Sequence, residues 1–74
     1  MNNLFEYVKE SMNSPIVSKI VFDPKSKYAI LYLRIKNDSD LGEARKLHYL
    51  ASRYNLLSSI AISKKIKMII VRVI

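Results

Sequence analysis

Residues 27–36 alternate between two kinds of side chain at every second position, which is the period of a β-strand. One face of this predicted strand is wholly apolar and comprises Ala29, Leu31, Leu33 and Ile35. The other face comprises Tyr28, Ile30, Tyr32, Arg34 and Lys36. A chain of 74 residues forms only a thin core, so an apolar face left in water would be costly. The strand must therefore bury its apolar face, whereas its mixed face suits either a packed interface or contact with bases and phosphates.

The residues at the start of the chain predict a helix over residues 3–13. Asn3 and Glu6 have the spacing of a capping box, with Asn3 as the N-cap. The expected apolar stripe is formed by Phe5, Val8 and Met12, helped by Leu4. Pro15 ends the helix because proline disfavours helical geometry in the residue before it.

A second strand pattern follows over residues 16–22. The alternation predicts Ile16, Ile20 and Phe22 on one face and Val17, Lys19 and Val21 on the other. Asp23 and Pro24 are typical of the first two positions of a type I turn. Residues 16–36 therefore predict an antiparallel hairpin.

A second helix is predicted from Asp40 to about residue 56. Asp40 and Glu43 have capping-box spacing. The expected apolar stripe is Ala44, Leu47, Ala51 and Tyr54, with Leu50 beside it. The opposite side carries Arg45, Lys46, Tyr49, Ser52 and Arg53.

Residues 58–74 are β-like, but Lys64-Lys65 lacks the glycine or asparagine of a tight hairpin. They could form two strands, over residues 60–63 and 67–73, or one long strand with a bulge, and two strands are favoured. The order is then α-β-β-α-β-β, without a linker or an internal repeat. We expect one α+β domain over residues 1–74, with a mainly antiparallel sheet of three or four strands and both helices packed on one face.

Composition and charge limit where the chain works and what it binds. There are no cysteines, no basic start followed by an apolar run, and no apolar stretch long enough to span a bilayer, so we expect a cytoplasmic protein that does not bind membranes. Residues 1–24 have two lysines against three acidic residues, whereas residues 25–74 have eleven lysines and arginines against three. This imbalance favours a polyanionic partner.

The sequence contains no recognisable catalytic motif. Gly42 is the only glycine, which excludes a glycine-rich phosphate loop, and His48 is the only histidine, which excludes a multi-histidine metal site. Asp38, Asp40 and Glu43 form a compact acidic cluster, but the start of a helix accounts for them without a metal. We expect no enzymatic activity, no cofactor and no metal.

Two surfaces remain as candidate binding sites. The first is a row on the second helix made of Lys46, Tyr49 and Arg53, flanked by Arg45, with Arg34 and Lys36 on the strand as further contacts. The second is the mixed sheet face, whose tyrosines could stack on bases. That face also carries Val17, Val21, Ile30, Met68 and Ile70, which make it apolar for a surface left in water.

The leading hypothesis is a basic protein that binds DNA or RNA through phosphate contacts from the second helix. It would form a homodimer through the mixed sheet face, with an interface made of Tyr28, Ile30, Tyr32, Val17 and Ile70. The alternative is a protein-interaction or inhibitor module that uses the apolar sheet face or a β-edge.

Overall fold

The computed structural model describes residues 3–74, and residues 1 and 2 of the N-terminal segment lie outside it. The described residues form two helices and four strands in the order α-β-β-α-β-β, which confirms the predicted α+β fold. The elements are α1 (Asn3–Ser11), β1 (Val17–Asp23), β2 (Tyr28–Arg34), α2 (Asp38–Arg53), β3 (Ser58–Ser63) and β4 (Met68–Val73). Residues 58–74 thus form two strands, as favoured.

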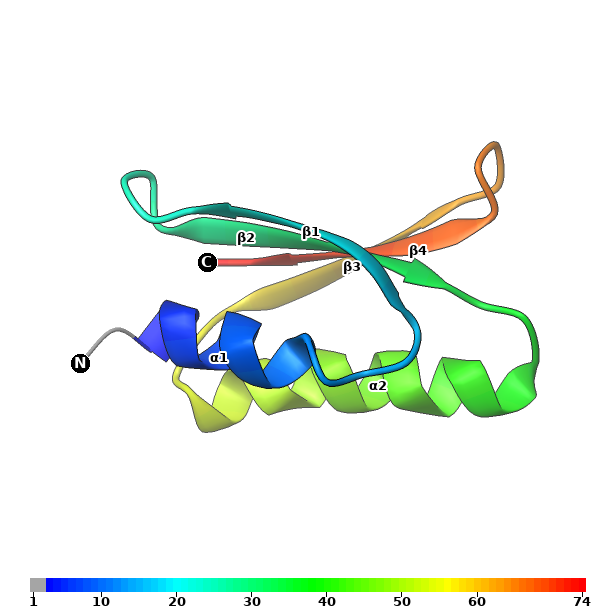
Figure 1. Cartoon of the computed structure of the whole chain (residues 1–74), viewed down its shortest axis with the longest axis horizontal. Helices are drawn as coiled ribbons and strands as arrows, with labels where there is room; N and C mark the ends of the chain where they lie inside the picture. The colour runs from blue at the N-terminus through cyan, green and yellow to red at the C-terminus, as the bar shows by residue number, and fades with distance from the viewer. Residues whose placement is uncertain (1–2) are drawn as a thin grey trace.

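The four strands form one antiparallel sheet in the order β1-β2-β4-β3, with β1 and β3 at its edges. Both helices cover the same face of the sheet (Figure 1). The side chains of β2 and β4 that point toward the helices are buried and form the centre of the core, namely Ala29, Leu31, Leu33, Ile69, Val71 and Val73. We call the other face, which no helix covers, the open face.

Helix α1 buries a different stripe from the predicted one. Phe5 and Met12 are 48% and 68% exposed, so the expected stripe is wrong at both positions, and the helix ends at Ser11 rather than residue 13. The buried residues are Leu4, Tyr7, Val8 and Ser11. The Tyr7 hydroxyl donates a hydrogen bond of 2.7 Å to the Leu47 carbonyl, which gives this buried polar group its partner and joins the helices.

Helix α2 begins two residues before the predicted start, because Asn37 rather than Asp40 is its N-cap. The Asn37 side chain accepts a hydrogen bond of 3.2 Å from the Asp40 backbone N–H. Asp40 turns back instead, and its Oδ2 accepts from the Lys36 N–H at 2.8 Å. The predicted apolar stripe is confirmed: Ala44, Leu47 and Ala51 are buried, and Leu50 and Tyr54 pack against the core.

One face assignment in β1 is wrong because of a β-bulge. The register shifts between Val17 and Lys19, so Val17 pairs with Leu33 while Lys19 pairs with Tyr32. The extra residue turns Val17 to the face that the helices cover, where it packs against the core. Val17 therefore cannot belong to an interface on the open face.

The backbone repeats its α-β-β unit, although no repeat was expected from the sequence. Each hairpin loop ends in a lysine with positive φ, Lys27 (57°) and Lys67 (54°), which are 40 residues apart. The same separation relates Leu31 to Val71, and these two residues pair with each other in the sheet. A pseudo-two-fold axis therefore passes between Leu31 and Val71.

The helices follow the same correspondence. Three pairs of residues that are 40 apart are buried in both units: Leu4 and Ala44, Tyr7 and Leu47, Ser11 and Ala51. The hydrogen bond from Tyr7 to Leu47 joins one of these pairs directly. The domain is thus two α-β-β units that share one core along their common axis.

Candidate nucleic-acid interface

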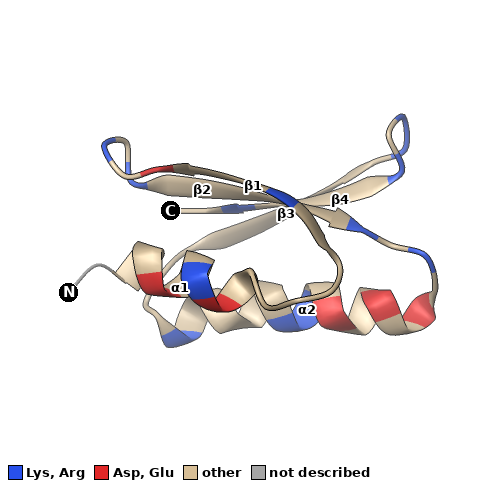
Figure 2. Ribbon diagram, in the orientation of Figure 1, with Lys and Arg blue, Asp and Glu red and all other residues tan. Residues whose placement is uncertain are grey.

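Charge divides between the two layers of the molecule. Helices α1 and α2 carry four basic and five acidic residues, whereas residues 17–36 and 58–73, which include the two hairpins, carry nine basic residues and one acidic residue. Figure 2 shows the acidic residues concentrated on the helices and the basic residues on the strands and hairpin loops. The net charge of +7 therefore belongs to the sheet layer, which sequence position alone did not reveal.

Two tyrosines lie on the open face of β2, and each has a cation beside its ring. The Lys19 Nζ lies 5.8 Å from the centroid of the Tyr32 ring, and the Arg72 Cζ lies 5.9 Å from that of Tyr28. These distances allow cation–π attraction. The predicted mixed face is therefore confirmed for Tyr28 and Tyr32, with cations supplied by the neighbouring strands.

The apolar residues of the open face are less exposed than the sequence implied. Ile30 and Ile70 lie there as predicted, with Val21 and Met68 beside them, and all four are only partly exposed. Arg34 lies at the end of β2 and is exposed. The open face is thus a mixed surface of tyrosines, cations and half-buried aliphatic side chains.

The hairpin loops add lysines at both ends of the sheet. Both loops rise on the side away from the helices (Figure 1), and their lysines are Lys25, Lys27, Lys64, Lys65 and Lys67, all exposed. Asp23 shapes the first loop, because its Oδ1 accepts from the Lys25 and Ser26 N–H groups at 3.0 and 3.2 Å. Ser63, at the corresponding position, accepts from the Ile66 N–H at 3.4 Å.

The helix row is exposed as predicted, but its surroundings are not basic. Lys46, Tyr49 and Arg53 line a groove of about 570 Å³ between the helices, which Glu10 and Glu43 line as well. The Lys46 Nζ lies 3.4 Å from Glu43 Oε1. Arg45 is exposed on the same helix. Two acidic and two basic residues thus face this groove.

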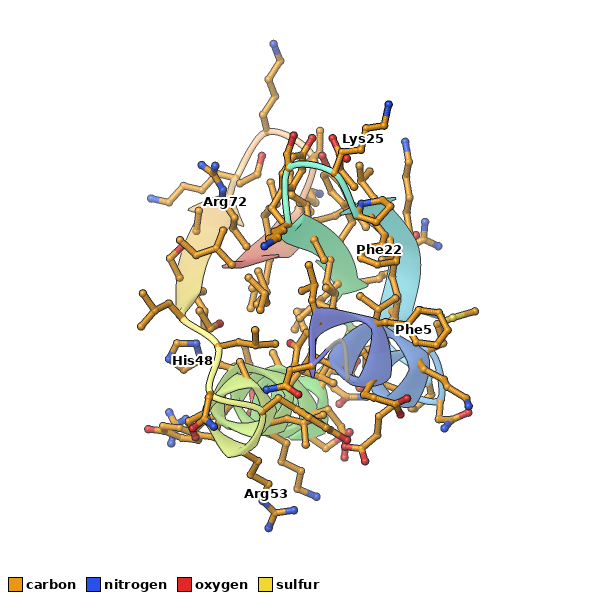
Figure 3. The ribbon with its side chains drawn as sticks, turned by 90° about the vertical axis from the view of Figure 1, so that its left-hand side faces the viewer. Phe5, Phe22, Lys25, His48, Arg53 and Arg72 are labelled. Atoms are coloured by element: carbon orange, nitrogen blue, oxygen red, sulfur yellow. The ribbon has the colours of Figure 1, made fainter. Side chains whose placement is uncertain are left out.

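Arg53 and the open-face cations project in opposite directions. Figure 3 shows Arg53 projecting from the helix side, away from the sheet, whereas Lys25 and Arg72 project from the sheet side. Lys36 is exposed in the segment between β2 and α2. The helix row and the open face thus lie on opposite sides of the molecule.

The single histidine of the sequence joins two elements of the fold. The Nδ1 of His48 lies 2.8 Å from the Ser58 Oγ, which joins α2 to the start of β3. Within residues 3–74, no three histidine, aspartate or glutamate side chains are grouped so that they could hold a metal ion. In that same part of the chain, neither helix combines the length and apolar character needed to cross a bilayer.

No protein-family model matches this chain, and the searches of curated proteins and of solved structures found no match either. The candidate interface therefore rests on geometry and charge. The sequence placed Tyr28 and Tyr32 on the open face, as residues of an expected dimer interface, and Arg34 among the expected phosphate contacts, but it gave little weight to the loop lysines. Their signal was the position of each lysine in a turn between two strands.

Proposed function

We propose that this protein is a non-enzymatic nucleic-acid-binding protein whose binding surface is the open face, extended by the lysines of both hairpin loops. The observation that supports it most strongly is the charge of the sheet layer, nine basic residues against one acidic. The open face replaces the helix row as the favoured surface, because acidic side chains accompany the cations of that row. A polyanion gains most where cations gather without neighbouring acids.

The tyrosines specify which form of nucleic acid fits. Tyr28 and Tyr32 lie four residues apart on one strand, which is about 13 Å. An open sheet can offer such rings to unpaired bases, while a duplex keeps its bases stacked and out of reach. We infer that the ligand is single-stranded DNA or RNA, with Lys19, Arg34 and Arg72 placed for its phosphates.

Fluorescence anisotropy with labelled single-stranded oligonucleotides tests this proposal. The wild-type affinity should fall steeply with added salt, because bound cations release counterions. Tyr32→Ala should weaken binding by about 1–3 kcal/mol, whereas Tyr32→Phe retains the stacking surface and most of the affinity.

A matched pair of arginine variants separates the two surfaces. Arg72→Glu on the open face should weaken binding strongly, and Arg53→Glu on the helix row should have little effect. If Arg53→Glu were the more damaging variant, the helix row would be the binding surface. Failure of the wild-type protein to bind any single-stranded oligonucleotide at low salt would refute the proposed function.

A further inference from the structure

Edge strand β3 carries two exposed isoleucines. Ile60 and Ile62 point toward the helix layer, since they pair with Val71 and Ile69, yet they are 44% and 72% exposed. The corresponding residues of edge strand β1, Ile20 and Phe22, pack against the core instead. Figure 3 shows Phe5 of α1 beside Phe22, and their ring centroids are 6.3 Å apart.

The position in α2 that corresponds to Phe5 is Arg45, which is exposed. An arginine there supplies no ring to cover Ile62. The helix layer therefore covers the apolar side chains of one edge strand and leaves those of the other in water.

The backbone of β3 also has a free edge. Leu57 and Ile74 exchange two hydrogen bonds of 2.9 Å, which makes them a hydrogen-bonded pair of the antiparallel ladder. In such a ladder, alternate residues direct their N–H and C=O groups to opposite sides. Residues 59, 61 and 63 therefore bond to β4, while the backbone groups of Ile60 and Ile62 point outward from the sheet.

Edge strand β3 lacks the features that prevent edge-to-edge pairing. Strand β1 has a bulge, a charged Lys19 side chain on the open face and Asp23 at its end, and each of these discourages pairing with a further strand. Strand β3 has the sequence Ser-Ser-Ile-Ala-Ile-Ser, with no charge, no proline and no register shift in its pairing with β4. It can accept another strand, and its own sequence specifies which one.

Residues 59–63 read Ser-Ile-Ala-Ile-Ser, which is the same in both directions. We propose that β3 pairs antiparallel with β3 of a second copy of this chain, on a two-fold axis at Ala61. This register places Ile60 opposite Ile62 of the second copy, so the outward backbone groups of both residues exchange hydrogen bonds. It is an isologous contact, in which each copy uses the same surface.

The register also suits the side chains. Four isoleucines, two from each copy, meet on the helix side of the joined sheet, which removes their exposed surface from water. On the open face, the small Ala61 meets its own counterpart. Lys64 lies opposite Ser58 of the second copy, so the lysine-rich loops lie at opposite ends of the seam and do not repel each other there.

The pairing joins two four-stranded sheets into one sheet of eight strands. It leaves the tyrosines and cations of both open faces uncovered, unlike the face-to-face dimer expected from the sequence. A face-to-face dimer would bring Lys19, Arg34 and Arg72 of one copy toward those of the other. The edge contact does not depend on nucleic-acid binding, and its test below contains no nucleic acid.

Single-cysteine variants of the full chain test the register, because the natural sequence has no cysteine. The two copies of residue 61 would form a non-hydrogen-bonded pair with Cα atoms about 4.5 Å apart, within the range of a disulfide. The two copies of residue 59 would lie about 13 Å apart, too far for a disulfide. Under mild oxidation, Ala61→Cys should form a covalent dimer, and Ser59→Cys should remain mostly monomeric.

The isoleucine variants provide a second measurement by sedimentation velocity. Ile62→Lys should abolish the concentration-dependent dimer, because it places a charge at the seam. Ile66→Lys is the matched control, since Ile66 is also exposed but lies in the loop. Circular dichroism should show both variants folded.

Three results would overturn the proposal. Equal cross-linking of Ser59→Cys and Ala61→Cys would show random collision rather than this register. A wild-type chain that is monomeric at every concentration, together with no cross-linking of Ala61→Cys, would exclude the contact. A dimer that survives Ile62→Lys but dissociates with Ile30→Lys would place the interface on the open face.

Discussion

The two α-β-β units have the same backbone plan, but their outer surfaces differ. Both contribute a buried central strand, a hairpin with a lysine at positive φ, and a helix on the same face of the sheet. The first unit carries Tyr28 and Tyr32 of the open face and has an edge strand with a bulge, whereas the second has an edge strand with exposed isoleucines. The comparison shows that one chain topology can support two surface roles, because the core sets the backbone and the outward side chains set the contacts.

The shared core gives the largest expected effect. Leu31, on the pseudo-two-fold axis, is fully buried, so Leu31→Ala should lower the free energy of unfolding by about 2–5 kcal/mol. Small domains have only about 5–15 kcal/mol of stability in total, so this loss would be a large fraction of it. Urea denaturation followed by circular dichroism measures the difference.

Ile62→Ala is the control at an exposed position of the second unit. It should change the stability by no more than about 0.5 kcal/mol when measured on dilute, monomeric protein. If Leu31→Ala had no larger effect than Ile62→Ala, the two units would not share a core at this position.

A smaller effect is expected where the helices meet. Tyr7→Phe removes the hydrogen bond to the Leu47 carbonyl, which should cost about 0.5–1.5 kcal/mol because that carbonyl keeps its partner within α2. Thermal and urea denaturation near pH 7 measure this loss. An unchanged stability would show that this contact does not hold the two units together.

The contribution of Tyr7 to stability should also depend on pH. Burial raises the pKa of the Tyr7 hydroxyl above its ordinary value of 10.0, although a hydrogen bond involving Ser11 lowers it in part. The folded protein therefore keeps a proton that the unfolded chain releases, so the Tyr7 contribution is complete below pH 10 and declines as the pH rises through the raised pKa.

The stability difference between the wild-type protein and Tyr7→Phe should therefore shrink above pH 10. The pKa of Tyr54 is raised as well, first by burial and then by Glu10, but Tyr54 is present in both proteins and its contribution cancels. A difference that stayed constant with pH, or grew, would contradict the assignment to Tyr7.

The smallest effect compares the two hairpin loops. Lys27 and Lys67 both have positive φ, a region that glycine enters without steric cost. Lys27→Gly and Lys67→Gly should each raise the stability, by up to about 1 kcal/mol and by similar amounts. Thermal denaturation of the two variants measures these effects. A large difference between them would show that the loops are not equivalent.

The sequence by itself determined the order of the elements and the faces of the central strands. The alternation in residues 27–36 placed Leu31 and Tyr32 correctly, and the spacing in α2 identified its buried stripe. These features are local, since side-chain periodicity follows directly from helix and strand geometry. The predicted stripe of α1 was wrong because Phe5 and Tyr7 both carry large rings, and local spacing does not decide which ring is buried. The packing of α1 against α2 buries Tyr7 and leaves Phe5 half exposed.

Only the tertiary structure decided which strands lie at the edges, and which layer carries the charge. Strand order depends on contacts between residues 34 to 44 apart in the chain, which no local pattern contains. The bulge before Lys19 turned Val17 to the core, because one inserted residue reverses the faces that alternation predicts. The packing of both nearly neutral helices onto one side of a basic sheet then created the open face, and the end of the sheet at β3 created the free edge.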